Sequence, residues 1–127
     1  MTHRRASVLA LGDLTALLVF ALVGLASHDD GITLAGVART WLPIAGCYAL
    51  AALAFGAWTH VGLWRVACAW AVGVAAGVLV RALVLGRSLD GDQLQFLAVA
   101  LATTLVLLAA WRGTEHAMRR ARRGVPG

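Results

Sequence analysis

A single aspartate interrupts the apolar run near the start of the chain. Asp13 lies in LALGDLTALLVFALVG, the stretch from Leu9 to Gly24, in which every other residue is apolar, small or hydroxyl-bearing. A carboxylate near the centre of a membrane helix costs about 2.5 to 3.5 kcal/mol, so such a residue usually faces other helices or water and has a function. Asp13 is therefore the first candidate for proton or cation chemistry.

Arg81 is a second ionisable residue in an apolar setting. It follows Gly73 and Gly77 at four-residue spacing, which places all three residues on one face of a helix. Small residues at this spacing allow close helix approach and favour an arginine that points into the bundle. The alternative is that Arg81 extends outward to water or to Asp90 and Asp92.

Helix geometry limits what Asp13 can reach. At about 1.5 Å per residue, Asp13 lies ~10 Å from the cytoplasmic end of its span and Arg81 lies ~22 Å from that end, so a direct ion pair would have to bridge ~12 Å. A connection through water or a hydroxyl is preferred. The candidate partners at the level of Asp13 are Thr15, Trp70, Thr103 and Thr104. Among hydroxyls and without a cation, the carboxyl would be neutral, which suits proton exchange or a static polar clamp.

Composition identifies the elements that must position these residues. The 127 residues are 61% hydrophobic and 13% charged, whereas charged residues make up about 25% of soluble domains. The sequence predicts an all-α polytopic integral membrane protein, a four-transmembrane-helix bundle forming one membrane domain over residues 1–127. The helices are expected at about 6–26, 34–58 with a kink near Pro43, 66–85 and 94–111, followed by a basic tail at 112–127.

Pro43 leaves two interpretations of the second helix. Either the helix begins near Thr40, with the proline in its first turn, or Leu34 to Trp41 is an interfacial helix that kinks into the span. The second interpretation is preferred.

The arginines predict the topology. The side that holds both termini and the turn at 59–65 carries eight arginines, and the other side carries Arg39 and Arg87. By the positive-inside rule both termini are cytoplasmic, and the wholly arginine-based positive charge favours a bacterial inner membrane protein. The tryptophans are expected to be interfacial anchors, at the inner side for Trp58, Trp64 and Trp111 and at the outer side for Trp41.

Two exposed groups of charges have candidate roles. The cluster that follows the last span is expected to contact lipid headgroups, through Arg119, Arg120, Arg122 and Arg123. It is not expected to bind nucleic acid, because no aromatic or groove-reading element accompanies it. On the outer face, His28 is a candidate pH-sensitive or solvated residue, together with Asp90 and Asp92.

The sequence offers no catalytic, metal or cofactor site. Cys47 and Cys68 fall within predicted helices and form no CxxC pair. The motifs HExxH, GxSxG, GxxxxGK[ST] and GxGxxG are absent. An enzyme is therefore disfavoured, although a lipid-modifying activity would have Asp13, His28 and Arg81 as its candidate set.

Several short motifs resemble one prokaryotic family. These are Gly12-Asp13-Leu14, His28, the proline in the second helix, the G-V-x-x-G-x-x-x-R of Gly73 to Arg81, and the closing Trp111-Arg112. Together they resemble domain of unknown function 3054 over nearly the whole chain. The resemblance implies four spans and no established activity.

Two functional hypotheses follow. The first is a homo-oligomeric transporter or channel component for an unknown small substrate or ion, with Asp13 as the proton- or cation-handling group, because four helices enclose little of a pathway. Its size and first-helix carboxylate are similar to those of the small multidrug-resistance exporters. The alternative is a non-transporting assembly or accessory protein whose buried polar residues fix helix packing.

Overall fold

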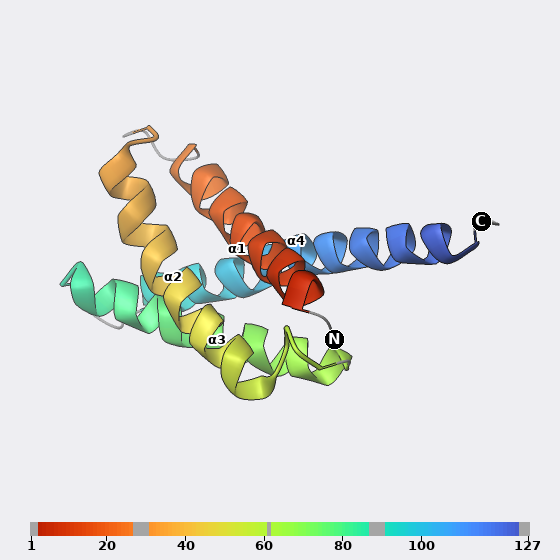
Figure 1. Ribbon diagram of the computed structural model, residues 1–127. Helices are drawn as coiled ribbons and strands as arrows, with labels where there is room; N and C mark the ends of the chain where they lie inside the picture. The colour runs from red at the N-terminus through yellow and green to blue at the C-terminus, as the bar shows by residue number, and fades with distance from the viewer. Residues whose placement is uncertain (1–2, 27–30, 61, 87–90, 125–127) are drawn as a thin grey trace.

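The chain folds entirely into α-helices in the part that the structure describes. The computed structural model describes residues 3–26, 31–60, 62–86 and 91–124 (Figure 1). The helices are α1 (His3–Ala26), α2 (Leu34–Phe55), α3 (Leu63–Val84) and α4 (Gly91–Gly124). All four are long and apolar enough to cross a membrane. The prediction of an all-helical chain with four such helices is confirmed.

The last helix is longer than the sequence analysis expected. α4 continues to Gly124, through most of the residues assigned to a basic tail. Glu, Ala, Met and Arg favour helix in this stretch, and Glu115 lies one turn before Arg119, with Oε1 3.5 Å from Nε. The helix ends at the glycine two residues before Pro126, as the preference for glycine and proline beyond helix ends predicts.

The second helix begins and ends at identifiable signals. Thr33 is its N-cap, and its hydroxyl accepts a hydrogen bond from the Gly36 amide at 3.0 Å. Pro43 lies within this one helix, so a helix that begins near Thr40 is wrong. α2 stops at Phe55 instead of continuing to residue 58, because Gly56 adopts a φ of 69° and its amide turns back to the carbonyls of Ala52 and Leu53.

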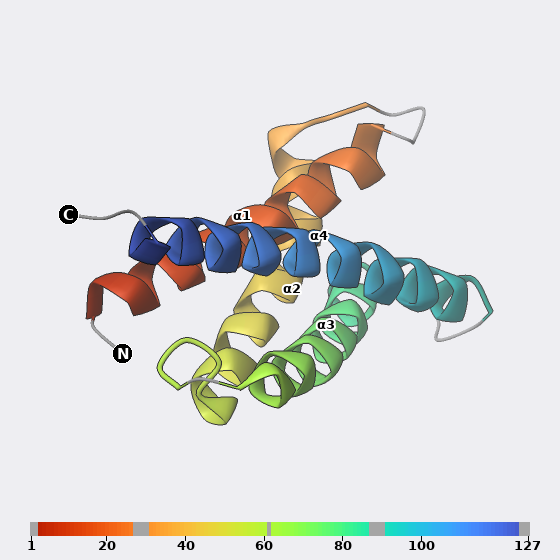
Figure 2. The same cartoon turned by 90° about the vertical axis from the view of Figure 1, so that its right-hand side faces the viewer.

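Each helix packs against its neighbours in sequence, and α4 also packs against α1 (Figure 2). The approach of α3 to α2 is very close: a Cβ added at Gly73 would lie 2.6 Å from Cα of Tyr48, and one at Gly77 would lie 2.5 Å from Cα of Ile44. These contacts agree with the close approach expected from the small residues of α3. The beginning of α1, the end of α4 and the α2–α3 turn lie at one end of the bundle.

Large apolar side chains are exposed along all the described helices. Leu11, Leu50, Leu83 and Leu94 are each about two-thirds or more exposed. A soluble monomer rarely leaves so much apolar surface in water, whereas lipid-facing helices require it. The polar residues that the bundle buries are therefore the ones that need an explanation.

Candidate functional site

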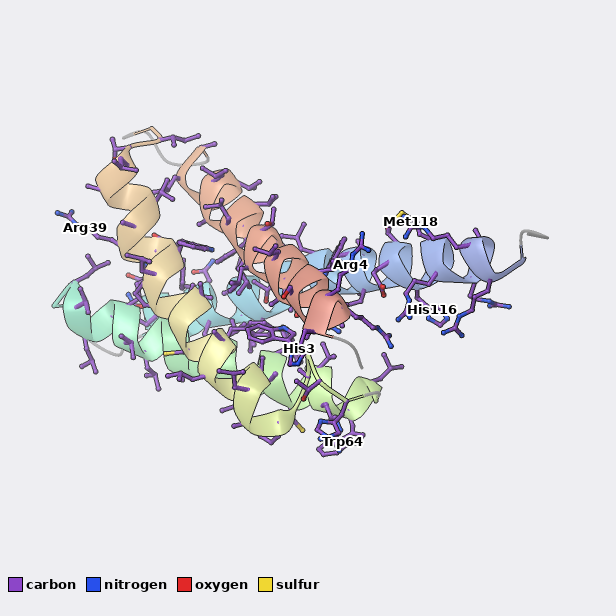
Figure 3. All side chains as sticks on the ribbon, viewed as in Figure 1. His3, Arg4, Arg39, Trp64, His116 and Met118 are labelled. Carbon is purple, nitrogen blue, oxygen red and sulfur yellow. The ribbon has the colours of Figure 1, made fainter. Side chains whose placement is uncertain are left out.

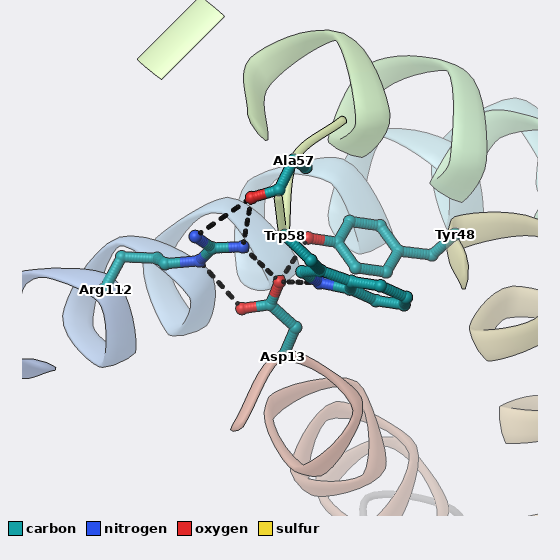
Figure 4. A network of polar contacts seen from close by, with 5 residues as sticks. All are labelled: Asp13, Tyr48, Ala57, Trp58 and Arg112. Atoms are coloured by element: carbon teal, nitrogen blue, oxygen red, sulfur yellow. Dashed lines mark hydrogen bonds and ion pairs between the residues drawn. The ribbon is translucent and has the colours of Figure 1, made fainter. Parts of the chain in front are cut away.

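The carboxylate of Asp13 is fully buried and receives hydrogen bonds from three side chains (Figure 4). Its Oδ2 accepts from the Tyr48 hydroxyl at 2.7 Å and from Nε1 of Trp58 at 2.9 Å. Arg112 donates from Nε to Oδ1 at 2.9 Å and from Nη2 to Oδ2. These four residues are called the Asp13 cluster below.

Three helices and one turn supply the Asp13 cluster. Asp13 comes from α1, Tyr48 from α2 and Arg112 from α4, while Trp58 follows α2 in the turn. The left-handed conformation of Gly56 reverses the chain and brings this turn back over the cluster. The turn also supplies the Ala57 carbonyl, which accepts weaker hydrogen bonds from the Arg112 guanidinium at 3.4 and 3.5 Å.

The geometry of the cluster explains how a carboxylate can be buried here. A carboxylate has about four lone-pair positions, and a guanidinium is a planar donor that can fill two of them side by side. Arg112 supplies the opposite charge, and Tyr48 and Trp58 satisfy the remaining acceptor capacity of Oδ2. A paired and fully hydrogen-bonded charge is the form in which an ionisable residue is tolerated inside a bundle.

The arginine that pairs with Asp13 is Arg112 and not Arg81, for which a connection through water or a hydroxyl was preferred. The guanidinium of Arg81 instead stacks on the ring of Phe96, 4.3 Å from its centroid, in a cation–π contact between α3 and α4. A carboxyl bonded to threonine hydroxyls with no cation nearby was one arrangement considered for Asp13. The structure instead places Arg112 against Asp13, and the hydrogen bonds come from Tyr48, Trp58 and Arg112.

The threonines and Trp70 form contacts elsewhere. Nε1 of Trp70 donates to Oγ1 of Thr104 and to the Leu101 carbonyl, both at 3.1 Å, which ties α3 to α4. The Thr15 hydroxyl donates to the carbonyl of Leu11 in its own helix. Thr103 is half-buried on α4. The hydrogen bonds of Asp13 come from none of these residues.

Two of the expected interfacial tryptophans have a different role. Trp58 is 8% exposed and bonded to Asp13, so it is not an anchor in the lipid interface. Trp41 crosses from α2 to α1, where its indole donates to the Leu14 carbonyl at 3.1 Å. Trp64 remains exposed, and the guanidinium of Arg65 lies over its ring in a cation–π contact. Trp111 packs against Gly12, where a Cβ would overlap its ring.

The other candidate residues lie away from the Asp13 cluster. His28 and Asp90 are outside the described residues, and Asp92 is exposed in the first turn of α4. Arg120, Arg122 and Arg123 are exposed, and Arg119 is half-buried beside Glu115. In Figure 3 the labelled side chains of His116 and Met118 project from opposite sides of this part of α4, and Arg39 points away from the bundle.

Sequence reasoning missed Tyr48, Trp58 and Arg112 as members of the site. Arg112 was treated as the start of an interfacial tail because the apolar stretch ends at Trp111. One signal could have corrected this: no proline follows until Pro126, and the residues after Arg112 favour helix, so α4 did not have to end there. Tyr48 carried a weaker signal, as the only tyrosine in the chain.

A cavity of about 560 Å³ adjoins the Asp13 cluster. Arg112 lies in its wall, with 17% of its side chain exposed. The other polar or aromatic lining residues are Arg5, His60, Trp70, Glu115 and His116. Within the described ranges, no group of three or more His, Cys, Asp or Glu side chains could hold a metal ion.

The fold and the site define a class: a small helical protein with four helices capable of spanning a membrane and a buried ion pair between the first and the last. The chain belongs to the family described as "Protein of unknown function (DUF3054)", whose profile matches residues 10–114. The matched region includes all four residues of the Asp13 cluster. Comparison with curated proteins and with solved structures finds no match.

Proposed function

We propose that this chain is a multi-pass membrane protein of the assembly or accessory type, in which the Asp13 cluster locks α1, α2 and α4 in register. The observation that carries the proposal is that the fully buried carboxylate of Asp13 already receives four hydrogen bonds, two of them from Arg112. A carrier site must exchange its proton or ion with the solution. A carboxylate held in this way serves to join helices.

The orientation and location belong to the same proposal. The end of the bundle with the beginning of α1 and the end of α4 carries the arginines Arg4, Arg5, Arg65, Arg112, Arg119, Arg120, Arg122 and Arg123. Under the positive-inside rule this end is cytoplasmic. The protein then resides in a bacterial inner membrane, with lipid as its immediate partner.

Transport by a homo-oligomer is the second candidate function, and the cavity beside Arg112 favours it. Arg112 contacts Asp13 on one side and the cavity on the other. An anion that reached the guanidinium from the cavity would compete with the carboxylate for it, and a proton that reached the carboxylate of Asp13 would neutralise it, so either event would weaken the ion pair. In that case the cluster would be a gate that opens during each transport cycle.

The substitution Asp13→Asn distinguishes the two functions. If the cluster is a clamp, D13N lowers the apparent unfolding temperature in mild detergent and the yield of monodisperse protein, since the new amide N–H₂ faces donors. If the cluster is a gate, D13N remains folded and proton flux in proteoliposomes is lost. The matched control is Thr15→Asn, on the same helix but exposed, which leaves folding unchanged.

A further inference from the structure

The cavity beside Arg112 changes from apolar to charged along its length. On α4, the lining residues Leu105, Leu108 and Ala109 precede Arg112, and Glu115 and His116 follow it. On α1 the charged residue comes first in the sequence. Arg5 lines the cavity one turn before the apolar Leu9, so it lies nearer the beginning of α1. The charged lining residues therefore lie toward the beginning of α1 and the end of α4, which are at the same end of the bundle (Figure 2).

The α2–α3 turn and α3 also line the cavity. His60 and Gly62 line it from the turn, and Leu63 and Val66 line it from the first turns of α3. Together with Leu105 and Leu108 of α4, the side chains of Leu63 and Val66 form an apolar wall. A site with an apolar wall and a few convergent polar groups is typical of a binding pocket, and about 560 Å³ lies within the usual range of about 300–1,000 Å³.

Positive charge predominates at the charged end. Arg5, Arg112 and Glu115 line the cavity, and Arg119 and Arg123 lie close enough to act on the charge of Arg5. Asp13 neutralises Arg112, and Glu115 forms an ion pair with Arg119. The four arginines thus outnumber the two carboxylates, and His60 and His116 add donors at the cavity wall. Clustered guanidinium groups of this kind recognise phosphate oxygens.

We propose that this cavity binds an anionic phospholipid of the cytoplasmic leaflet, with its phosphate between Arg5 and His116 and an acyl chain along Leu63, Val66 and Leu105. The occupant is an amphiphile because the cavity joins a cationic end to an apolar wall. The inference rests on the proposed orientation, which puts this end of the bundle in the cytoplasmic leaflet, but it goes beyond the clamp function, and its tests leave Asp13 and Arg112 unchanged.

The charged end is tested with Arg5→Gln in purified, delipidated protein. The readout is native mass spectrometry during titration with phosphatidylglycerol. R5Q is expected to weaken binding roughly tenfold, as for loss of a charge-assisted hydrogen bond. Arg4→Gln removes the same charge from an exposed neighbour and is expected to change binding by less than about twofold, as for surface attraction screened by salt. Equal losses in both variants would overturn the proposal.

The apolar wall is tested independently with Ala109→Trp, which fills the cavity without altering a charge. Ala109 lines the cavity, and the exposed Ala110 beside it does not. A109W is expected to abolish binding of phosphatidylglycerol, and Ala110→Trp is expected to preserve it. Unchanged binding in A109W would overturn the proposal even if R5Q failed to fold. Equal binding of phosphatidylcholine, or saturation by inorganic phosphate alone, would also overturn it, because the ligand would then be neutral or not an amphiphile.

Discussion

Arg112 on α4 and Asp13 on α1 form a two-pronged ion pair although they lie 99 residues apart in the sequence. The pair joins the first helix to the last, and Tyr48 and Trp58 attach α2 and its following turn to the same carboxylate. This one contact accounts for how the bundle can bury a charge that the sequence leaves unexplained.

Removal of both charges of the ion pair should destabilise the protein by less than the sum of the two single removals. Arg112→Gln leaves a buried carboxylate without its counter-ion, and Asp13→Asn leaves a partly buried guanidinium, at a cost of about 3–5 kcal/mol each. The double substitution removes both charges and should lose less than the sum of the single losses. Unfolding titrations in detergent measure this double-mutant cycle. Strictly additive losses would show that the two side chains do not act together.

The indole of Trp58 should stabilise the fold through its hydrogen bond. Trp58→Phe keeps an aromatic ring but removes the donor to Oδ2, so we expect a loss of about 1.5–3 kcal/mol, as for hydrogen bonds to charged groups. Trp64→Phe is the matched control, because Trp64 is 57% exposed, and it should stay within about 0.5 kcal/mol of the parent. The same unfolding titration measures both variants. Similar stabilities for W58F and W64F would contradict the structural role of Trp58.

The close approach of α3 to α2 predicts opposite effects for two glycine substitutions. In Gly77→Ala the new methyl group would lie 2.5 Å from Cα of Ile44, so overpacking should cost about 1–3 kcal/mol. In Gly46→Ala the new methyl group meets nothing within 4 Å, so the better helix propensity of alanine should stabilise α2 by about 0.5–1 kcal/mol. Thermal unfolding in detergent compares the two. If G77A stabilised the protein, α2 and α3 would have to be farther apart at Gly77 than they are in this structure.

The proposed topology predicts which residues can be labelled from each side of the membrane. In a background with Cys47→Ala and Cys68→Ala, a cysteine at the exposed position Ile32 should react with a membrane-impermeant maleimide in intact cells. A cysteine at the exposed position Ala117 should react only after permeabilisation. Gel shifts after labelling provide the measurement. Reaction of the Ala117 variant in intact cells would show that the orientation is the opposite of the proposed one.

The sequence by itself determined the class of protein and the existence of its helices. Hydropathy and helix propensity are properties of consecutive residues, so the four apolar stretches could be located without tertiary information. The same local reasoning identified Asp13 as a costly residue and Gly73 and Gly77 as positions of close approach. It placed the end of α4 too early, at a change of polarity that does not end the helix.

Tertiary structure alone decided which residue pairs with Asp13. Trp111 of α4 packs against Gly12 of α1, and the turn that begins at Gly56 returns Trp58 to Asp13. These are contacts between segments that are far apart in the sequence. A depth calculated from residue number along one straight helix at a time takes no account of them. That calculation favoured the threonines over Arg81 as direct partners of Asp13, whereas packing placed Arg112 at the level of Asp13 and paired the two charges.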